Sequence, residues 1–403
     1  MAIKRVGILT AGGLAPCLSA SIANLILEYT KEAPQVEIIF YRYGYAGVLL
    51  GDSFSIGGDM RMQAQRLLRF GGSAIGNSRV KLTNGKDCEK RGLIRRGEDP
   101  QIVAAEQLRR DCIDVLHTIG GDDTNSVAAQ LSLYLQSNGY SMAVIGLPKT
   151  VDNDIVPIVQ TLGADTAATE GARFFSNVVN ECTTSPRMLI VHEIMGRHSG
   201  WLTYATARAY RRWLEKQEFL PSIGLDRRRW DIHGLYIPEC PINFAEEIER
   251  LRHVMETVGN VNVFVSEGAG VDIILDEMRE SGKEVPIDAF GHVKLDLINA
   301  GQWFGEHLSD GIGGQKLLVQ KSGYFARSAP PNSFDLELIR ETAKLAVFHG
   351  LRGQSGLVGK DEKCGEKMSL IDFARISGGR AFNANDSEFQ RFLGEITAIG
   401  SIQ

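Results

Sequence analysis

Short apolar runs rich in β-branched residues recur along the chain, and longer segments with helical spacing of apolar positions separate them. Such alternation is typical of α/β proteins, in which amphipathic helices cover mainly parallel sheets. The predicted strands are residues 6–10, 36–40, 115–119, 143–147, 188–194, 261–265 and 317–319. The predicted helices are residues 16–31, 60–70, 124–137, 166–181, 199–212, 244–258 and 334–348. Two stretches, 51–100 and 270–315, lack a strand pattern and are interpreted as insertions or loops.

Glycines and charged side chains cluster where most of the predicted strands end. In open α/β sheets, functional groups gather just beyond the carboxyl ends of the strands. The densest cluster is residues 148–154, Pro-Lys-Thr-Val-Asp-Asn-Asp, in which Lys149, Asp152 and Asp154 directly follow a strand. Chemistry on a phosphate group would use one cation beside two carboxylates. We therefore interpret this segment as the centre of a candidate site.

The composition is that of a globular protein and narrows the range of partners. A chain of 403 residues with 43% hydrophobic content can bury a full core and is expected to form two lobes. A net charge of −5 argues against nucleic acid as a partner, because such surfaces need clustered excess Lys and Arg. The short basic runs 211–212 and 227–229 are interpreted as solvated faces.

Cysteine spacing and hydropathy indicate the expected cellular location of the protein. The six cysteines are scattered singly without a C-x-x-C pair, which favours neither a disulfide framework nor a zinc site. No apolar run approaches the roughly 18 residues that a membrane span needs, and the first residues lack a signal-peptide core. We expect a cytoplasmic protein without a membrane partner.

Two glycine pairs are candidate phosphate-binding turns. Gly12 and Gly13 lie between a strand and a helix, where backbone N–H groups can hold phosphate oxygens. A turn that merely needs a positive φ explains this pair equally well. Gly71 and Gly72 precede Arg79, a cation that would reach a donor phosphate, although a plain surface turn is the simpler alternative.

Two adjacent carboxylates, Asp122 and Asp123, follow the strand at 115–119 and precede a helix. An Asp at the N-cap explains one carboxylate but leaves the second beside it, at a cost from like-charge repulsion. Mg²⁺ usually binds one or two carboxylates together with phosphate oxygens of the substrate. We therefore prefer Asp122 as a ligand of Mg²⁺.

Residues 195–200, Met-Gly-Arg-His-Ser-Gly, again join a strand to a helix. Arg197 would face the same crevice as Asp152, and we interpret it as an anion ligand. His198 lies next to it, but a single histidine at a helix start is more often structural. The same holds for His192 and His292, so none of these histidines is given a catalytic role.

Five motifs, in this order along the chain, resemble those of the 6-phosphofructokinases. They are residues 10–13 (TAGG), 120–123 (GGDD), 148–154 (PKTVDND), 195–197 (MGR) and 323–327 (GYFAR). The resemblance implies two Rossmann-like lobes, with mainly parallel sheets flanked by helices and the active site in the cleft between them. It assigns residues 1–164 with 327–375 to a phosphoryl-donor lobe and residues 165–326 with 376–403 to a sugar-phosphate lobe.

Asp123 and Lys149 stand where ATP-using members typically have glycine, a pattern similar to that of the pyrophosphate-dependent branch. A carboxylate at Asp123 would occupy the place of the ATP α-phosphate, and two unit charges about 4 Å apart near a protein surface repel by roughly 4 kcal/mol. The Lys149 ammonium would stabilise the charge that develops on the departing orthophosphate. The resemblance thus implies pyrophosphate as the donor.

The same resemblance implies a role for each remaining candidate. Asp152 would take the proton from the sugar 1-hydroxyl, Thr150 would touch the transferring group, Asp154 would support the metal region and Asp122 would hold Mg²⁺. Pyrophosphate contacts carry over to Gly13 and Arg79. The sugar-phosphate contacts carry over to Met195, Gly196, Arg197, Glu267, Tyr324 and Arg327, of which Arg327 suits the 6-phosphate.

The resemblance also bears on assembly and control. Arg187 matches an arginine that reaches a neighbouring subunit's site, which implies a homodimer or homotetramer with shared active sites. Leu14 replaces an acidic residue common in ATP-using members, and residues 19–31 lack the early arginine linked to effectors. Allosteric control is therefore not expected.

The expected reaction is Mg²⁺-dependent, reversible transfer of a phosphoryl group from pyrophosphate to C1 of fructose 6-phosphate, in glycolysis and gluconeogenesis. The nearest alternative is an ATP-dependent 6-phosphofructokinase of the same fold. An NAD-kinase-like or lipid-kinase-like enzyme also places Gly-Gly-Asp after a strand. A phosphosugar-binding regulator without turnover is a further alternative, against which the intact base Asp152 argues.

Overall fold

The computed structural model describes residues 3–285 and 295–399. The chain divides into two compact units, residues 1–166 with 327–380 and residues 167–326 with 381–403. Each unit contains a mainly or wholly parallel sheet flanked by helices, so the α/β class predicted from the alternating pattern is confirmed. The division of labour between a donor unit and a sugar-phosphate unit stays a prediction. Among the described helices, none is long and apolar enough to cross a membrane.

The first unit contains a seven-stranded sheet in the order β11-β10-β5-β4-β1-β2-β3. The pairs β10–β11 and β2–β3 are antiparallel, and the other neighbours are parallel. The strands are β1 (Arg5–Thr10), β2 (Glu37–Tyr41), β3 (Ser53–Ser55), β4 (Val115–Gly120), β5 (Ala143–Pro148), β10 (Gly356–Asp361) and β11 (Lys367–Ile371). The helices are α1 (Leu18–Glu32), α2 (Tyr45–Leu50), α3 (Gly58–Met62), α4 (Gly85–Lys90), α5 (Pro100–Arg110), α6 (Asp122–Ser137) and α15 (Ser333–Gly350).

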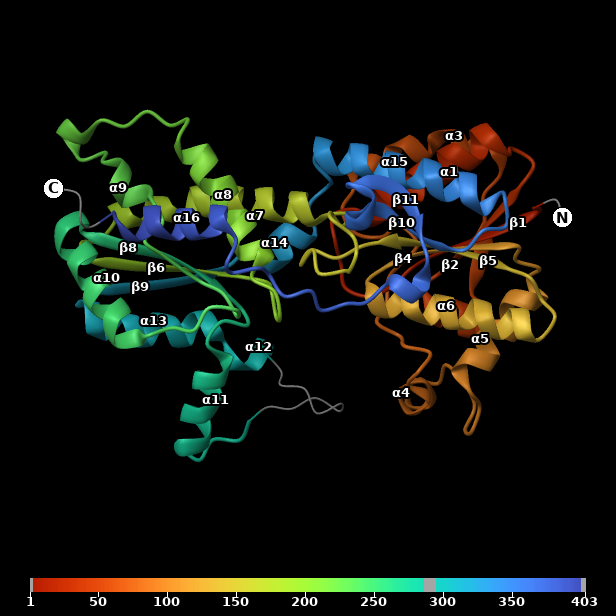
Figure 1. Ribbon diagram of the computed structural model, residues 1–403, viewed down its shortest axis with the longest axis horizontal. Coiled ribbons are helices and arrows are strands. Elements are labelled where there is room, and N and C mark those ends of the chain that lie inside the picture. The colour runs from red at the N-terminus through yellow and green to blue at the C-terminus, as the bar shows by residue number, and fades with distance from the viewer. Residues whose placement is uncertain (1–2, 286–294, 400–403) are drawn as a thin grey trace. The chain divides into compact units, whose positions relative to one another are not determined.

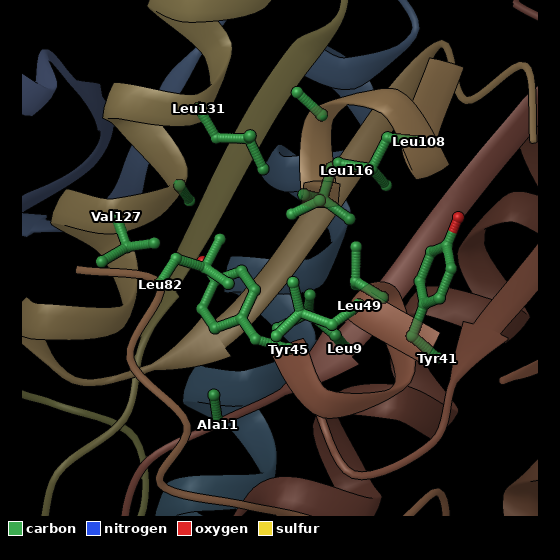
Figure 2. Packing of buried hydrophobic residues seen from close by; sticks show 14 of the residues in the cluster. Leu9, Ala11, Tyr41, Tyr45, Leu49, Leu82, Leu108, Leu116, Val127 and Leu131 are labelled. Atoms are coloured by element: carbon green, nitrogen blue, oxygen red, sulfur yellow. The ribbon is translucent and has the colours of Figure 1, made fainter. Parts of the chain in front are cut away.

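Helices cover both faces of this sheet: α1 and α15 pack on one face, and α2, α5 and α6 pack on the other (Figure 1). Figure 2 shows the core on the second face, where Leu9 and Leu116 of the sheet meet Leu49, Leu108 and Leu131 of the three helices. Full burial of such a side chain contributes about 1.5–3 kcal/mol. This packing fixes the central strands β1, β4 and β5, whose carboxyl ends lead into the candidate site.

The second unit contains a four-stranded parallel sheet in the order β7-β8-β6-β9. Its strands are β6 (Met188–Ile194), β7 (Gly234–Tyr236), β8 (Asn260–Ser266) and β9 (Lys316–Lys321). Its helices are α7 (Ala164–Val178), which begins at the unit boundary, α8 (Trp201–Leu214), α9 (Arg227–Trp230), α10 (Phe244–Val258), α11 (Val271–Glu280), α12 (Leu295–Ile298), α13 (Ala300–Ile312), α14 (Gly323–Arg327) and α16 (Ser387–Thr397). α10 and α13 pack on one face of the sheet, and α7, α8 and α16 on the other (Figure 1).

The interpretation of the two stretches 51–100 and 270–315 as loops is wrong, and the alternative that they are insertions stays a prediction. Residues 51–100 contain β3, α3, α4 and a 3-10 helix (Gln63–Arg69), and residues 270–315 contain α11, α12 and α13, with 286–294, including His292, outside the described residues. Two glycines of α13 explain the second error, because they face the sheet. A Cβ at Gly301 would lie 2.7 Å from Glu193 Oε2, and one at Gly305 would lie 2.8 Å from Leu317 Cδ1. These glycines permit close packing of a helix on a sheet rather than mark a loop.

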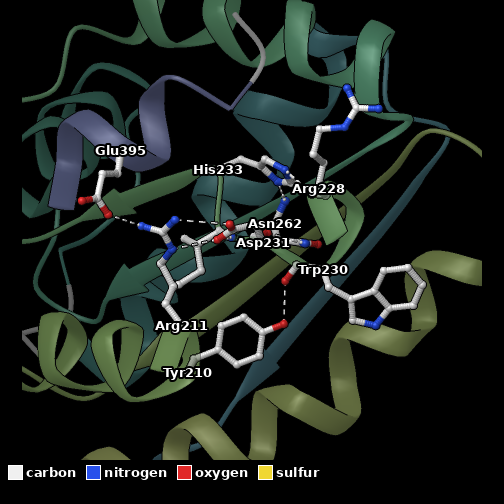
Figure 3. Close-up of polar contacts among 9 residues, drawn as sticks. Tyr210, Arg211, Arg228, Trp230, Asp231, His233, Asn262 and Glu395 are labelled. Carbon is white, nitrogen blue, oxygen red and sulfur yellow. Dashed lines mark hydrogen bonds and ion pairs between the residues drawn. The ribbon is translucent and has the colours of Figure 1, made fainter. Parts of the chain in front are cut away.

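A polar network in the second unit joins α8, α16 and the residues before β7 (Figure 3). The Arg211 side chain, 14% exposed, pairs with Asp231 at 3.0 Å and with Glu395 of α16 at 2.8 Å. Burial raises the pKa of Asp231, and Arg211 opposes this shift. The interpretation of residues 211–212 as a solvated face is therefore wrong for Arg211, which compensates a buried carboxylate.

Candidate functional site

Three neighbouring parallel strands of the first sheet bring the predicted donor-side residues together. The strands lie in the order β5-β4-β1, with Thr10 opposite Ile119 and Ile119 opposite Leu147. Because the strands end in register, the segments that follow them start at the same edge of the sheet. These segments are Gly12-Gly13, Asp122-Asp123 and residues 149–154.

A cavity of about 280 Å³ lies at this edge. Four carboxylates and four cations are among the residues that line it: Asp122, Asp123, Asp152, Asp154, Arg79, Lys81, Lys149 and Arg327. Gly13 and Thr150 also belong to its wall. The structure thus gathers the sequence-predicted donor-side residues around one space whose mixed charges suit a phosphate group together with a metal ion.

Lys149 is buried in this wall, with 4% of its surface exposed. Its Nζ donates a hydrogen bond to the carbonyl oxygen of Gly13 at 2.6 Å. The pKa of Lys149 is lowered to about 8, chiefly by burial; the nearby Arg327 and Arg79 also lower it, whereas Cys17 and Asp152 raise it. Lys149 therefore links the glycine turn after β1 to the segment after β5, and its charge changes close to neutral pH.

Asp122 is the first residue of α6, and the N-cap position is Gly121. The alternative in which one of the two carboxylates caps the helix is therefore wrong. Asp123 forms an ion pair with Lys81, with Nζ and Oδ2 2.5 Å apart and side-chain exposures of 51% for Lys81 and 64% for Asp123. Sequence reasoning missed Lys81. Its signal was a second cation two residues after the candidate Arg79, and both residues line the cavity.

The donor set fits Mg²⁺ bound together with a substrate. Among the described residues, no group of three or more His, Cys, Asp or Glu side chains is arranged to hold a metal on its own. Asp122 faces the cavity beside Asp123, Asp152 and Asp154. One or two carboxylates completed by phosphate oxygens and water is the usual arrangement for Mg²⁺, so Asp122 is a suitable ligand in the presence of a phosphorylated substrate.

The turn that carries Thr150 and Asp152 is held by its own side chains. Asn153 has a φ of 53°, and its Oδ1 accepts a hydrogen bond from the N–H of Thr161 at 2.8 Å. Thr161 Oγ1 donates to the carbonyl oxygen of Thr150 at 2.8 Å, and the N–H of Asp152 donates to Thr150 Oγ1 at 3.2 Å. Asparagine tolerates this left-handed conformation better than most residues. Asn153 and Thr161, which sequence reasoning did not single out, therefore shape the turn.

The Gly71-Gly72 turn is not a plain surface turn, so the simpler alternative is wrong. The N–H of Ser19, in the first turn of α1, donates to the carbonyl oxygen of Gly72 at 2.8 Å. A Cβ at Gly71 would lie 2.0 Å from the carbonyl oxygen of Ser328. The turn thus closes over the start of α1, which leaves the N–H of Ser19 unavailable to a phosphate.

The predicted sugar-phosphate residues of the second unit also lie directly after strands. Residues 195–197 follow β6, Glu267 follows β8 and Tyr324 follows β9, and these three strands are neighbours. A Cβ at Gly268 would lie 2.0 Å from the carbonyl oxygen of Arg197, and one at Gly323 would lie 3.1 Å from Met195 Cε. The three segments therefore pack closely, and a cavity of about 620 Å³ borders Arg197 and His198.

Two predicted residues have contacts that the sequence did not indicate. Arg327, the last residue of α14, lies against Gly13, where an added Cβ would be 3.0 Å from Arg327 Nη2, so it groups with the donor-side residues. Arg187 has a φ of 52° and donates from Nε to the carbonyl oxygen of Gly313 at 2.7 Å and from Nη2 to that of Ile312 at 3.1 Å. Arg187 thus binds the C-terminal end of α13, and its predicted role in a neighbouring subunit stays a prediction.

A cavity lined by carboxylates and cations lies at the strand ends of one α/β unit, and a loop that carries an arginine follows a strand of the other. This arrangement fits the class of α/β phosphotransferases. Comparison with protein families narrows this class. The chain belongs to the phosphofructokinase family, whose model, "Phosphofructokinase", matches residues 5–348.

Two relatives have the name pyrophosphate–fructose 6-phosphate 1-phosphotransferase. The one from Methylomonas methanica is 56% identical over 393 residues, which cover 98% of this chain and 96% of the relative. The one from Propionibacterium freudenreichii subsp. shermanii is 56% identical over 394 residues, which cover 98% of each chain. A solved structure of a pyrophosphate-dependent phosphofructokinase from Marinobacter aquaeolei has the same fold, with a TM-score of 0.71 and 20% identity over 98% of this chain and 92% of that one.

Proposed function

We propose that the protein transfers a phosphoryl group from pyrophosphate to the C1 hydroxyl of fructose 6-phosphate, reversibly and with Mg²⁺, giving fructose 1,6-bisphosphate and orthophosphate. The relatives named for this reaction align with 98% of the chain and support the proposal. The observation that carries the donor assignment is the presence of Asp123 and Lys149 in the wall of one cavity. We further propose a cytoplasmic enzyme without allosteric control.

The ion pair between Asp123 and Lys81 alters how Asp123 can exclude ATP. A bare carboxylate would repel pyrophosphate as well as ATP, but Lys81 compensates the charge of Asp123. Since both side chains are about half exposed, solvent also screens them, so the repulsion is smaller than the roughly 4 kcal/mol of an uncompensated pair. Asp123 then acts mainly by occupying the space that the rest of a nucleotide would need, and a small inorganic donor avoids this obstruction.

The chemistry needs one proton transfer and one displacement at phosphorus. Asp152 accepts the proton of the sugar 1-hydroxyl while that oxygen bonds to phosphorus and the bridging P–O bond of pyrophosphate breaks. The leaving orthophosphate keeps the bonding electron pair, and the Lys149 ammonium stabilises its charge. Mg²⁺ held by Asp122 and the donor oxygens would neutralise further phosphate charge when it is bound.

The experiment that tests the donor assignment is a coupled assay with each donor, in both directions. We expect turnover with pyrophosphate and much slower turnover with ATP, and comparable rates with the two donors would refute the assignment. The double variant Asp123→Gly with Lys149→Gly should lose pyrophosphate activity and gain at most weak use of ATP. Absence of turnover in the wild type, with normal binding of fructose 6-phosphate to Asp152→Asn, would favour a regulator instead.

A further inference from the structure

The loop that joins β6 to α8 is anchored near both of its ends within the second unit. At one end, Gly196 has a φ of 138°, and Ser266 Oγ donates a hydrogen bond to its carbonyl oxygen at 2.6 Å. At the other end, the N–H of Gly200, the N-cap of α8, donates to both carboxylate oxygens of Glu239, at 3.1 and 3.0 Å. Met195 and Arg197 lie in or beside the segment between these anchors.

Glu239 comes from outside the loop and holds two backbone segments with one carboxylate. Besides the Gly200 contact, its Oε1 accepts a hydrogen bond from the N–H of Phe382 at 2.7 Å, in the segment that leads to α16. Bonds from backbone N–H groups to a charged carboxylate are stronger than bonds between neutral groups, and a negative charge is favourable at a helix N-terminus. Glu239 is therefore well suited to fix the start of α8.

The close approach of the loop to Glu239 depends on glycine. A Cβ at Gly200 would lie 2.4 Å from Ile237 Cβ and 2.8 Å from Glu239 Oε2. Arg197, His198 and Glu239 also border the same cavity of about 620 Å³. The position of the loop is thus tied to the residues directly after β7, which none of the sequence motifs includes.

We propose that Glu239 is a positioning residue for the sugar phosphate. It sets the path of residues 195–200 through Gly200, and so orients Met195, Gly196 and Arg197 without touching the reacting atoms. This inference rests on the proposed function, in which those three residues bind fructose 6-phosphate. Loss of the Glu239 carboxylate should therefore weaken binding of the acceptor and leave the donor site unchanged.

The test is steady-state kinetics of Glu239→Ala in the full-length protein, with fructose 6-phosphate and pyrophosphate varied separately. We expect the KM for fructose 6-phosphate to rise about tenfold, with kcat and the KM for pyrophosphate within about twofold of wild type. Glu239→Gln keeps one acceptor oxygen and should recover most of the affinity. Cys240→Ala, a change in the same cavity wall, is the matched control and should behave as wild type.

Ser266→Ala removes the anchor at the other end of the loop and should give the same acceptor-specific rise in KM, which keeps the inference testable if Glu239→Ala does not fold. An unchanged KM for fructose 6-phosphate in either folded variant would overturn the inference. A parallel loss of thermal stability, kcat and affinity for both substrates would also overturn it, because it indicates a purely structural role. Wild-type inactivity with fructose 6-phosphate would instead contradict the proposed function.

Discussion

The proposed chemistry needs the positive charge of Lys149, but burial of this side chain disfavours its charged form. Burial lowers its pKa from 10.5 to about 8, so the donor-free protein loses the ammonium as the pH rises past that value. We predict that pyrophosphate binds about tenfold more weakly at pH 9 than well below pH 8. At pH 9 about nine-tenths of Lys149 is neutral in the donor-free protein. Calorimetry in buffers of different ionisation enthalpy should show proton uptake on binding near pH 8.

Lys149→Met is the control for this pH dependence, because wild type and variant share the ionisation of pyrophosphate itself. Equal pH dependence in both proteins would contradict the assignment. The same pKa shift makes the free energy of unfolding of the donor-free protein depend on pH. The unfolded chain keeps the Lys149 proton up to about pH 10.5, so stability of the donor-free protein should rise between about pH 8 and 10.5.

Lys81 has a testable part in donor binding. Lys81→Met leaves the Asp123 carboxylate without its partner at the cavity wall, so its charge faces the incoming donor. Because the pair is about half exposed, we predict a rise of about threefold to fivefold in the KM for pyrophosphate. Lys86→Met, which changes an exposed lysine outside the cavity wall, is the control. An unaltered KM would show that Lys81 does not compensate Asp123.

At the scale of elements, the central strands were predictable because they carry mostly apolar runs rich in β-branched residues. β6 coincides with the prediction, and β1, β4 and β5 differ from it by one residue at one end. β10, with the sequence Gly-Leu-Val-Gly-Lys-Asp, was missed because its two glycines dilute the apolar pattern. At Gly359 an added Cβ would lie 2.6 Å from Ile158 Cδ1, so this glycine serves a tertiary contact that the local sequence does not reveal.

Those residues of the candidate site that directly follow the central strands were also predictable from the sequence. Asp122, Asp123, Lys149, Thr150 and Asp152 stand directly after strands, so parallel strand order alone brings them together. The supporting residues were not predictable, because their roles depend on contacts between segments distant in sequence. Glu239 is 39 residues from Gly200, for example, and 143 residues from Phe382.

Gly378, which follows the 3-10 helix Phe373–Arg375, provides a test of the proposed Mg²⁺ ligand. A Cβ at Gly378 would lie 1.7 Å from Asp122 Oδ2, so Gly378→Ala must displace this carboxylate. We predict a roughly tenfold increase in the Mg²⁺ concentration for half-maximal activity, with the KM for fructose 6-phosphate unchanged. Gly58→Ala, where an added Cβ has no neighbour within 4 Å, is the control. An unchanged Mg²⁺ titration would argue against Asp122 as a ligand.

At the scale of the whole molecule, the two halves of the proposed reaction are distributed over two units. The donor-side residues, with Arg327, belong to the first unit, and Met195, Arg197, Glu267 and Tyr324 belong to the second. The chain passes between the units after residues 166, 326 and 380. Each unit builds its residues at the strand ends of its own sheet, so a substitution in one unit should affect one substrate more than the other.

Among the predicted site residues, Arg187 is the one that bears on assembly. Its bonds to Gly313 and Ile312 use two of the three guanidinium nitrogens, which leaves one for a further acceptor. We predict that Asp152→Asn and Arg187→Ala are each nearly inactive and that co-expressed, differently tagged subunits regain activity. In randomly formed dimers with shared sites, about a quarter of all sites carry neither change.

Co-expression of Asp152→Asn with Thr150→Ala is the matched control, because both residues belong to the turn after β5 and every mixed site should carry one change. We expect no recovery in that pair. If the Asp152→Asn and Arg187→Ala pair also stays inactive, each active site is built within one subunit. Arg187 then acts through the end of α13, and the variant should lose thermal stability rather than affinity alone, because two carbonyl oxygens lose their charged donor.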